Sequence, residues 1–253
     1  MTDTQQSSRR GGREARRALR AAPLANDVRP VNPGMESGRY KVLSDADVVK
    51  VHEAALDVLQ HIGLADAIPS CIELLTAKGC TLSPEGRLVF PRTLIDETLA
   101  MAGRHFPLYA QDPQYDMEPW GKKVYYGTAG AAVYIVDPVT GEYRESTAQD
   151  CYDIARLVDT MEHIHFYQRT VVTRDLPDPM EMHVNTCYLS VSGTPKHVGT
   201  SWVHPDRLEK SLQMLHHVAG GEQQWRERPF VSQSNCFVVP PLDRKSTRLN
   251  SSH

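Results

Sequence analysis

The sequence predicts an α/β protein: an incomplete TIM (β/α)8 barrel preceded by a small helical lead-in. Apolar segments begin at His163, Lys196 and Phe230, 33 and 34 residues apart, and one helical pattern lies between each pair. This repeat has the length of a βα unit in a parallel sheet. No strand is followed by the glycine-rich motifs of dinucleotide or P-loop sheets, so we favour a barrel over a doubly wound sheet.

Length and composition limit the alternatives. The chain has 253 residues, of which 40% are hydrophobic and 23% charged, as in ordinary globular proteins. A complete barrel needs ~250 residues by itself, so we expect only part of one here. The net charge of −3 provides no basic field for nucleic acid, and no apolar run approaches the ~20 residues of a membrane span.

The cysteine pattern favours a cytoplasmic location. Five cysteines are widely spaced, odd in number and without a C-x-x-C pair, which is typical of reduced thiols rather than a disulfide framework or a zinc knuckle. They are Cys71, Cys80, Cys151, Cys187 and Cys236.

Both ends are predicted to lie outside the fold. Residues 1–38 hold six arginines between Arg9 and Arg20 with one acid, which predicts a disordered basic tail, with a transit peptide or an anion-binding arm as alternatives. Residues 243–253 resemble the translation of a sequencing-library adapter. We therefore expect native sequence to end near Leu242 and the chain to be the N-terminal fragment of a longer protein.

Residues 39–104 are predicted to form the helical lead-in. Ser44 and Asp47 begin an amphipathic helix that ends at Gly63. Pro69 and Pro91 begin two further helices, because proline is favoured in the first turn.

Residues 105–242 are predicted to form the N-terminal part of the barrel. Thr147 with Asp150, Pro179 and Pro205 mark the starts of three helices. The expected strands cover 106–110, 124–126, 133–136, 163–172, 196–202 and 230–239, and 133–136 is expected to pair with 124–126.

The candidate site residues follow from their positions, because reacting groups of a barrel lie at the carboxyl ends of its strands. Arg169 is open to two interpretations, an anion-binding group or a structural ion-pair partner. The polar run 232–236 is costly inside an apolar strand unless it is hydrogen-bonded, either to a ligand or to the protein. The predicted substrate-binding residues are Gln168, Arg169, Ser201, Trp202, Gln233 and Asn235.

A second pattern suggests a different chemistry. His163 and His165 form an H-x-H pair with the spacing of metal ligands in barrel hydrolases. The pair begins its strand, however, at the end of a barrel that serves stability rather than catalysis. Structural histidines are therefore the favoured interpretation, and we predict no metal site.

Several segments together resemble the trimethylamine methyltransferase family, which includes glycine betaine members. The resemblance extends from about Lys41 to Leu242. Its segments are residues 43–45, 52–56, 108–113, 126–130, 166–169, 185–188, 196–201, 220–222 and 228–232.

The resemblance implies a TIM barrel that moves a methyl group from a quaternary or tertiary amine to the cobalt of a corrinoid. The corrinoid belongs to a separate partner protein, and this chain binds no cofactor directly. Aromatic faces hold ammonium groups well, so Trp202, Tyr167 and Tyr126 are candidates for a cage, with packing in the core as the favoured interpretation of each. The resemblance also implies that catalytic residues lie partly in a second half, without which the chain is expected to be inactive.

Two alternatives remain open at this point. One is a metal-dependent barrel hydrolase that uses His163 and His165, and the other is a non-catalytic fragment or binding module. The oligomeric state is also open, a homo-oligomer included.

Overall fold

The computed structural model describes residues 32–38, 40–202 and 205–234. Contacts divide the chain into Met1–Asn32 and Pro33–His253, and the description below concerns the second unit. The predictions for residues 1–31 and 243–253 lie outside the described residues. Among the described helices, none is long and apolar enough to cross a membrane.

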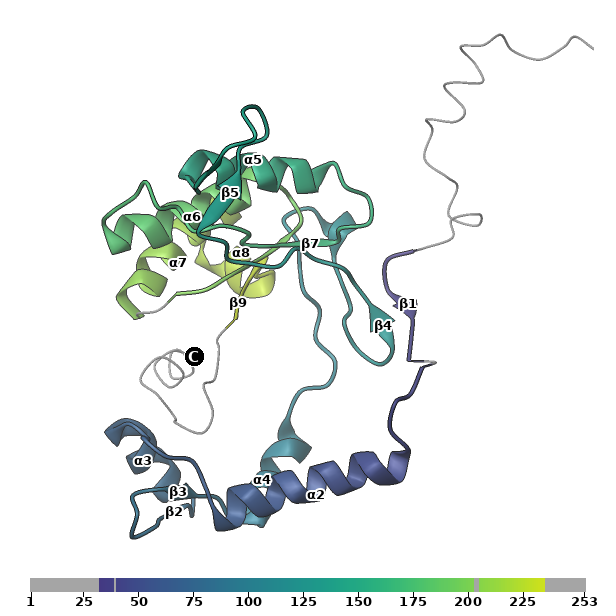
Figure 1. Cartoon of the computed structure of the whole chain (residues 1–253), viewed down its shortest axis with the longest axis vertical. Coiled ribbons are helices and arrows are strands. Elements are labelled where there is room, and N and C mark those ends of the chain that lie inside the picture. The colour runs from purple at the N-terminus through teal and green to yellow at the C-terminus, as the bar shows by residue number, and fades with distance from the viewer. Residues whose placement is uncertain (1–31, 39, 203–204, 235–253) are drawn as a thin grey trace, which may run out of the picture. The chain divides into compact units, whose positions relative to one another are not determined.

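The lead-in contains three helices and a hairpin (Figure 1). Strands β2 and β3 pair antiparallel, and Leu88 of β3 is fully buried. The Ser44 hydroxyl accepts a hydrogen bond from the backbone N–H of Asp47, so the predicted cap is present. The elements are α2 (Asp45–His61), α3 (Pro69–Thr76), β2 (Thr81–Leu82), β3 (Leu88–Val89) and α4 (Arg92–Met101).

Two short antiparallel strand pairs lie outside the lead-in, of which one joins segments before and after it, and a 3-10 turn covers Pro113–Tyr115. Strand β1 (Met35–Glu36) pairs with β4 (Lys123–Val124), so a strand lies within the segment predicted to be tail. Strand β5 (Tyr134–Val136) pairs with β6 (Tyr143–Glu145). The predicted pairing of 133–136 with 124–126 is therefore wrong, because the Asp137–Gly141 turn folds β5 onto the strand that follows it.

The main sheet has three parallel strands in the order β7, β8, β9. They are β7 (Phe166–Gln168), β8 (His197–Thr200) and β9 (Val231–Gln233). Residues 127–132 run parallel to β7 on its other side, through isolated bridges from Gly127 to Phe166 and from Ala132 to Val171. The predicted succession of parallel strands and helices is thus present in this region.

Four helices accompany these strands (Figure 1), and α5, α6, α7 and α8 contact one another in order. Thr147 and Asp150 form a complete capping box at α5, and the Asp178 carboxylate accepts two backbone N–H bonds at the start of α6. Each cap satisfies amides that the first helical turn leaves free. The helices are α5 (Ala148–Asp159), α6 (Pro179–Gly193), α7 (Pro205–Ala219) and the unpredicted α8 (Glu222–Glu227).

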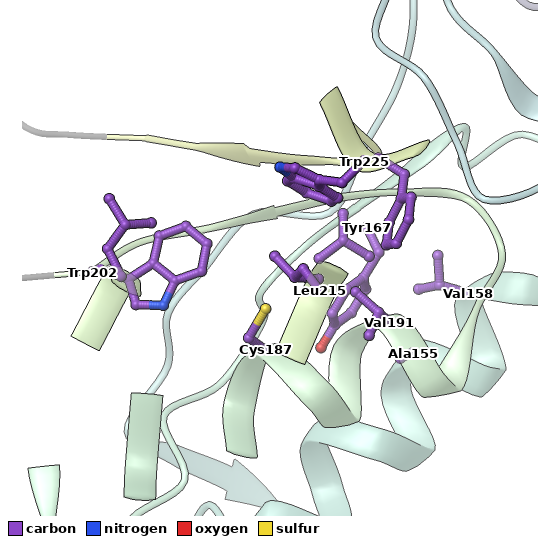
Figure 2. Packing of buried hydrophobic residues seen from close by; sticks show 11 residues of the cluster. Ala155, Val158, Tyr167, Cys187, Val191, Trp202, Leu215 and Trp225 are labelled. Carbon is purple, nitrogen blue, oxygen red and sulfur yellow. The ribbon is translucent and has the colours of Figure 1, made fainter. Parts of the chain in front are cut away.

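The core lies between the sheet and these helices. Tyr167 of β7 and Val198 of β8 are fully buried, and Figure 2 shows Tyr167 among Val191, Leu215 and Ala155. Side chains alternate along a strand, so the residues between them lie on the opposite face of the sheet. That second face is formed by Phe166, Gln168, His197, Gly199 and Ser232.

The amino-terminal end of the sheet contains a buried lysine. Lys196 is 3% exposed, and its Nζ donates to the backbone oxygens of Val158, Met161 and Ile164, each at 2.7 Å. Three acceptors match the three donors of an ammonium group. Lys196 thereby ties the end of α5 and the loop after it to the beginning of β8.

Candidate functional site

Gln168 lies at the carboxyl end of β7, on the face of the sheet that does not contact the helices. Its Nε2 donates to the Ser234 hydroxyl at 3.4 Å. A Cβ added at Gly199, the partner of Gln168 on β8, would overlap the Gln168 amide. The absence of a side chain on Gly199 therefore lets this amide lie across β8 toward the end of β9.

Thr128 holds Gln168 from the other side. The Thr128 hydroxyl donates to the backbone oxygen of Gln168 at 2.6 Å and accepts from its backbone N–H at 2.9 Å. The flanking glycines allow this close approach, because a Cβ at Gly127 would overlap the Phe166 ring and one at Gly130 the Arg169 carbonyl oxygen. Backbone contacts thus fix the position of Gln168.

Arg169 follows Gln168 and bonds to the end of β8. Its backbone N–H donates to the Gly199 oxygen at 2.8 Å, and its Nη2 donates to the Ser201 hydroxyl at 3.3 Å. Burial lowers the pKa of the guanidinium. The structure therefore joins two of the predicted site residues, Arg169 and Ser201, by a side-chain hydrogen bond, whereas the Gln168 side chain bonds to Ser234.

His183 belongs to the same region, although the sequence analysis did not identify it. It is 5% exposed, and the neighbouring backbone of Ser201 acts to raise the pKa of its ring. Burial lowers the pKa of His183 to about 4, and the charges of Arg207 and Arg169 act in the same direction. The available signal was helical spacing, because His183, Thr186, Cys187 and Ser190 are the buried side of α6.

Trp202 and Gln233, two other predicted site residues, lie on the helix side of the sheet. Both line a pocket of about 590 Å³ between β9 and the helices α7 and α8. The Trp202 ring is 3% exposed, belongs to the helix-facing core and donates from Nε1 to the Ser211 hydroxyl at 2.7 Å (Figure 2). Asn235 lies outside the described residues.

The three aromatic candidates do not form one cage. Tyr167 is fully buried, and its hydroxyl donates to the Cys151 backbone oxygen at 3.2 Å. Tyr126, by contrast, is 57% exposed. The hypothesis of Tyr167 as a cage member is wrong, because strand alternation directs its side chain into the helices.

The two histidines of the H-x-H pair differ in environment. His163 is exposed, whereas His165 is 5% exposed and accepts the Tyr126 backbone N–H at Nδ1, 2.8 Å away. Burial lowers the pKa of His165, as do the charges of Lys196 and His163. Within residues 32–38, 40–202 and 205–234, no group of three or more His, Cys, Asp or Glu is placed to hold a metal ion. The described residues therefore add no third ligand to this pair.

Comparison with known proteins gives one consistent result. Residues 9–252 match the family described as Trimethylamine methyltransferase (MTTB). The trimethylamine methyltransferase MttB of Desulfitobacterium hafniense is 30% identical over 198 residues, which are 78% of this chain and 40% of that protein. A glycine betaine methyltransferase of the same species is 25% identical over 210 residues, 82% of this chain and 43% of that protein.

An archaeal relative shows a similar extent of likeness. The trimethylamine methyltransferase MttB of Methanosarcina thermophila is 24% identical over 208 residues, 79% of this chain and 42% of that protein. The chain thus spans about two fifths of the length of these relatives. Because the family match covers nearly the whole sequence, this chain belongs to the trimethylamine methyltransferase family.

Proposed function

We propose that this chain takes part in moving a methyl group from a small quaternary or tertiary amine, of the trimethylamine or glycine betaine type, to the cobalt of a corrinoid held by a separate protein. The family match over residues 9–252 carries this proposal. Relatives named for trimethylamine and for glycine betaine support a methylated amine as the methyl donor.

The proposal includes a fold. We infer that residues 127–132, β7, β8 and β9 are consecutive strands of a TIM barrel, whose carboxyl ends form the catalytic face. Their parallel arrangement, with a helix before each of β7, β8 and β9, supports this inference. Closure of the barrel and a cytoplasmic location stay predictions.

The chemistry assigns a limited role to this chain. The corrinoid supplies the nucleophile that accepts the methyl group, so the protein residues must mainly bind and orient the amine and exclude water. At the described strand ends, Gln168 offers an amide, Ser201 and Ser234 offer hydroxyls, and Arg169 offers a cation.

A transfer assay tests the proposal. The folded chain would be mixed with reduced cobalamin or a corrinoid protein from Desulfitobacterium hafniense, and with trimethylamine or glycine betaine carrying a labelled methyl group. Because the chain spans about 40% of its relatives, a second reaction would add the remaining part of the relative from that species. We expect label on cobalt in at least one reaction, and its absence from both, with folded protein, would contradict the proposal.

A further inference from the structure

We propose that the carboxyl ends of β7 and β8 form a carboxylate-binding site, in which Arg169 binds the anion directly beside Ser201. This inference goes beyond methyl transfer, because it concerns an anionic group and not the methylated nitrogen. It rests on the surroundings of Arg169.

Arg169 is a largely buried cation without a described anion. Its guanidinium has five N–H donors, yet the Ser201 hydroxyl is its one side-chain acceptor among the described residues. Two other partly buried arginines are paired with carboxylates, Arg144 with Asp150 at 2.7 Å and Arg228 with Asp116 at 2.8 Å, whereas Arg87 donates to backbone oxygens. A buried charge normally has a partner, because removing it from water costs several kcal/mol.

The nearest ionisable groups do not provide the missing charge. Burial raises the pKa of the Cys151 thiol and raises that of the Tyr167 phenol, so both groups are neutral at pH 7. His183 is neutral as well, with its pKa lowered to about 4. The region around Arg169 therefore holds a cation and three neutral groups.

A second cation adds to this imbalance. Arg207, in the first turn of α7, acts on His183 together with Arg169. Both positive charges lower the pKa of His183, and the exposed acid Asp206 precedes Arg207 in the sequence. The charge of Arg169 itself disfavours a ligand whose only charge is positive.

The geometry favours a carboxylate among anions. The planar fork of arginine matches the two oxygens of a carboxylate and forms two parallel hydrogen bonds with it. A carboxylate carries one negative charge, which would neutralise Arg169. A doubly charged anion such as phosphate would cost more free energy to remove from water.

Ligand binding by the whole chain tests the site. Thermal unfolding and tryptophan fluorescence would be followed during titration with sodium acetate, glycine betaine, trimethylammonium chloride and sodium phosphate at constant ionic strength. Trp202 directly follows Ser201, so its fluorescence should respond to binding, against a background from Trp120 and Trp225. We expect acetate and glycine betaine to raise the melting temperature and trimethylammonium to leave it unchanged.

Variants identify the residue responsible. Arg169→Met should weaken carboxylate binding at least tenfold, and Arg169→Lys should weaken it less because the charge remains. Arg226→Met is the matched control, since Arg226 is 74% exposed and pairs with Glu222 on the surface, and it should bind as the unmodified chain does. If Arg169→Met fails to fold, Arg207→Met replaces it and should weaken binding severalfold.

The outcomes distinguish a carboxylate of the methylated substrate from a free carboxylate. They also test the carboxylate site independently of the proposed methyl transfer. Tighter binding of glycine betaine than of acetate would assign the carboxylate to a methylated substrate, and equal binding would assign it to a free carboxylate. No response of the folded chain, a response to phosphate alone, or unchanged binding by folded Arg169→Met would overturn the site. These measurements involve no methyl transfer, so their failure leaves the transfer assay as a separate test.

Discussion

Lys196 shows how one side chain can hold the amino-terminal end of the sheet. Replacing it with Met would keep the aliphatic stem but remove three hydrogen bonds from a charged donor, although the Val158 and Met161 oxygens each keep a backbone N–H donor. Hydrogen bonds to charged groups contribute ~1.5–3 kcal/mol, so we expect Lys196→Met to lower the free energy of unfolding by at least ~1.5 kcal/mol. Urea denaturation followed by circular dichroism measures this change. The exposed Lys210→Met is the control, and equal stability of the two variants would contradict the role of Lys196.

His183 should make stability depend on pH. Its pKa is about 4 in the folded protein and ~6.5 in an unfolded chain. Below pH ~6.5 the unfolded chain therefore binds a proton that the folded protein does not, so stability is full above this pH and falls as the pH approaches 4. The loss attributable to His183 is on the order of 3 kcal/mol.

Unfolding curves between pH 4 and 7.5 would measure this effect. We expect His183→Gln to have a shallower loss of stability with acid than the unmodified chain. His217→Gln, on the exposed side of α7, should keep the original slope. Parallel curves for all three proteins would show that His183 does not remain neutral on folding.

At the scale of elements, the segment 127–132 depends on glycine to lie against β7. A Cβ at Gly130 would overlap the Arg169 carbonyl oxygen, which is backbone and cannot move aside cheaply. We expect Gly130→Ala to lower the melting temperature by several degrees, corresponding to a loss of ~1–3 kcal/mol. Gly103→Ala is the control, because no atom lies within 4 Å of its added Cβ. Equal melting temperatures would mean that the segment does not pack as described.

The elements differ in how well the sequence predicts them. Helices α5 and α6 were predictable because Thr147 with Asp150 and Pro179 mark their starts chemically. The parallel course of residues 127–132 was not, because glycine, threonine and alanine give no apolar alternation. The pairing of β5 was predicted wrongly, since a turn of the Asp-Pro type determines register more strongly than the similarity of two apolar runs.

For the candidate site, position in a strand was more informative than residue type. Gln168, Arg169 and Ser201 were identified from their place at strand ends, and the structure joins Arg169 to Ser201 by a hydrogen bond and pairs Gln168 with Gly199 on the neighbouring strand. Trp202 and Gln233 were placed with them, yet they line the helix-side pocket because successive side chains in a strand point to opposite faces. His183 required knowledge of which helix covers β8, which one sequence does not contain.

At the scale of the whole molecule, burial is uneven between the lead-in and the region of the main sheet. Leu56 is the one buried residue of α2, and α3 and α4 have none, whereas α5 and α6 have several fully buried side chains. Segments with few buried apolar contacts open with lower free energies. We therefore expect amides of α2–α4 to exchange hydrogen for deuterium at least tenfold faster than those of β7, β8, α5 and α6. Exchange followed by mass spectrometry measures this, and uniform protection would contradict it.

The crossing of Gln168 over Gly199 links two positions 31 residues apart in the sequence. A methyl group at 199 and a long amide at 168 would occupy the same space, so the two positions are expected to change together as the family diverges. A relative with alanine or serine at the position of Gly199 should have a shorter side chain at that of Gln168. In this chain, Gly199→Ala should therefore be harmful alone and be compensated by Gln168→Ala, which a double-mutant cycle of melting temperatures would show as a favourable coupling.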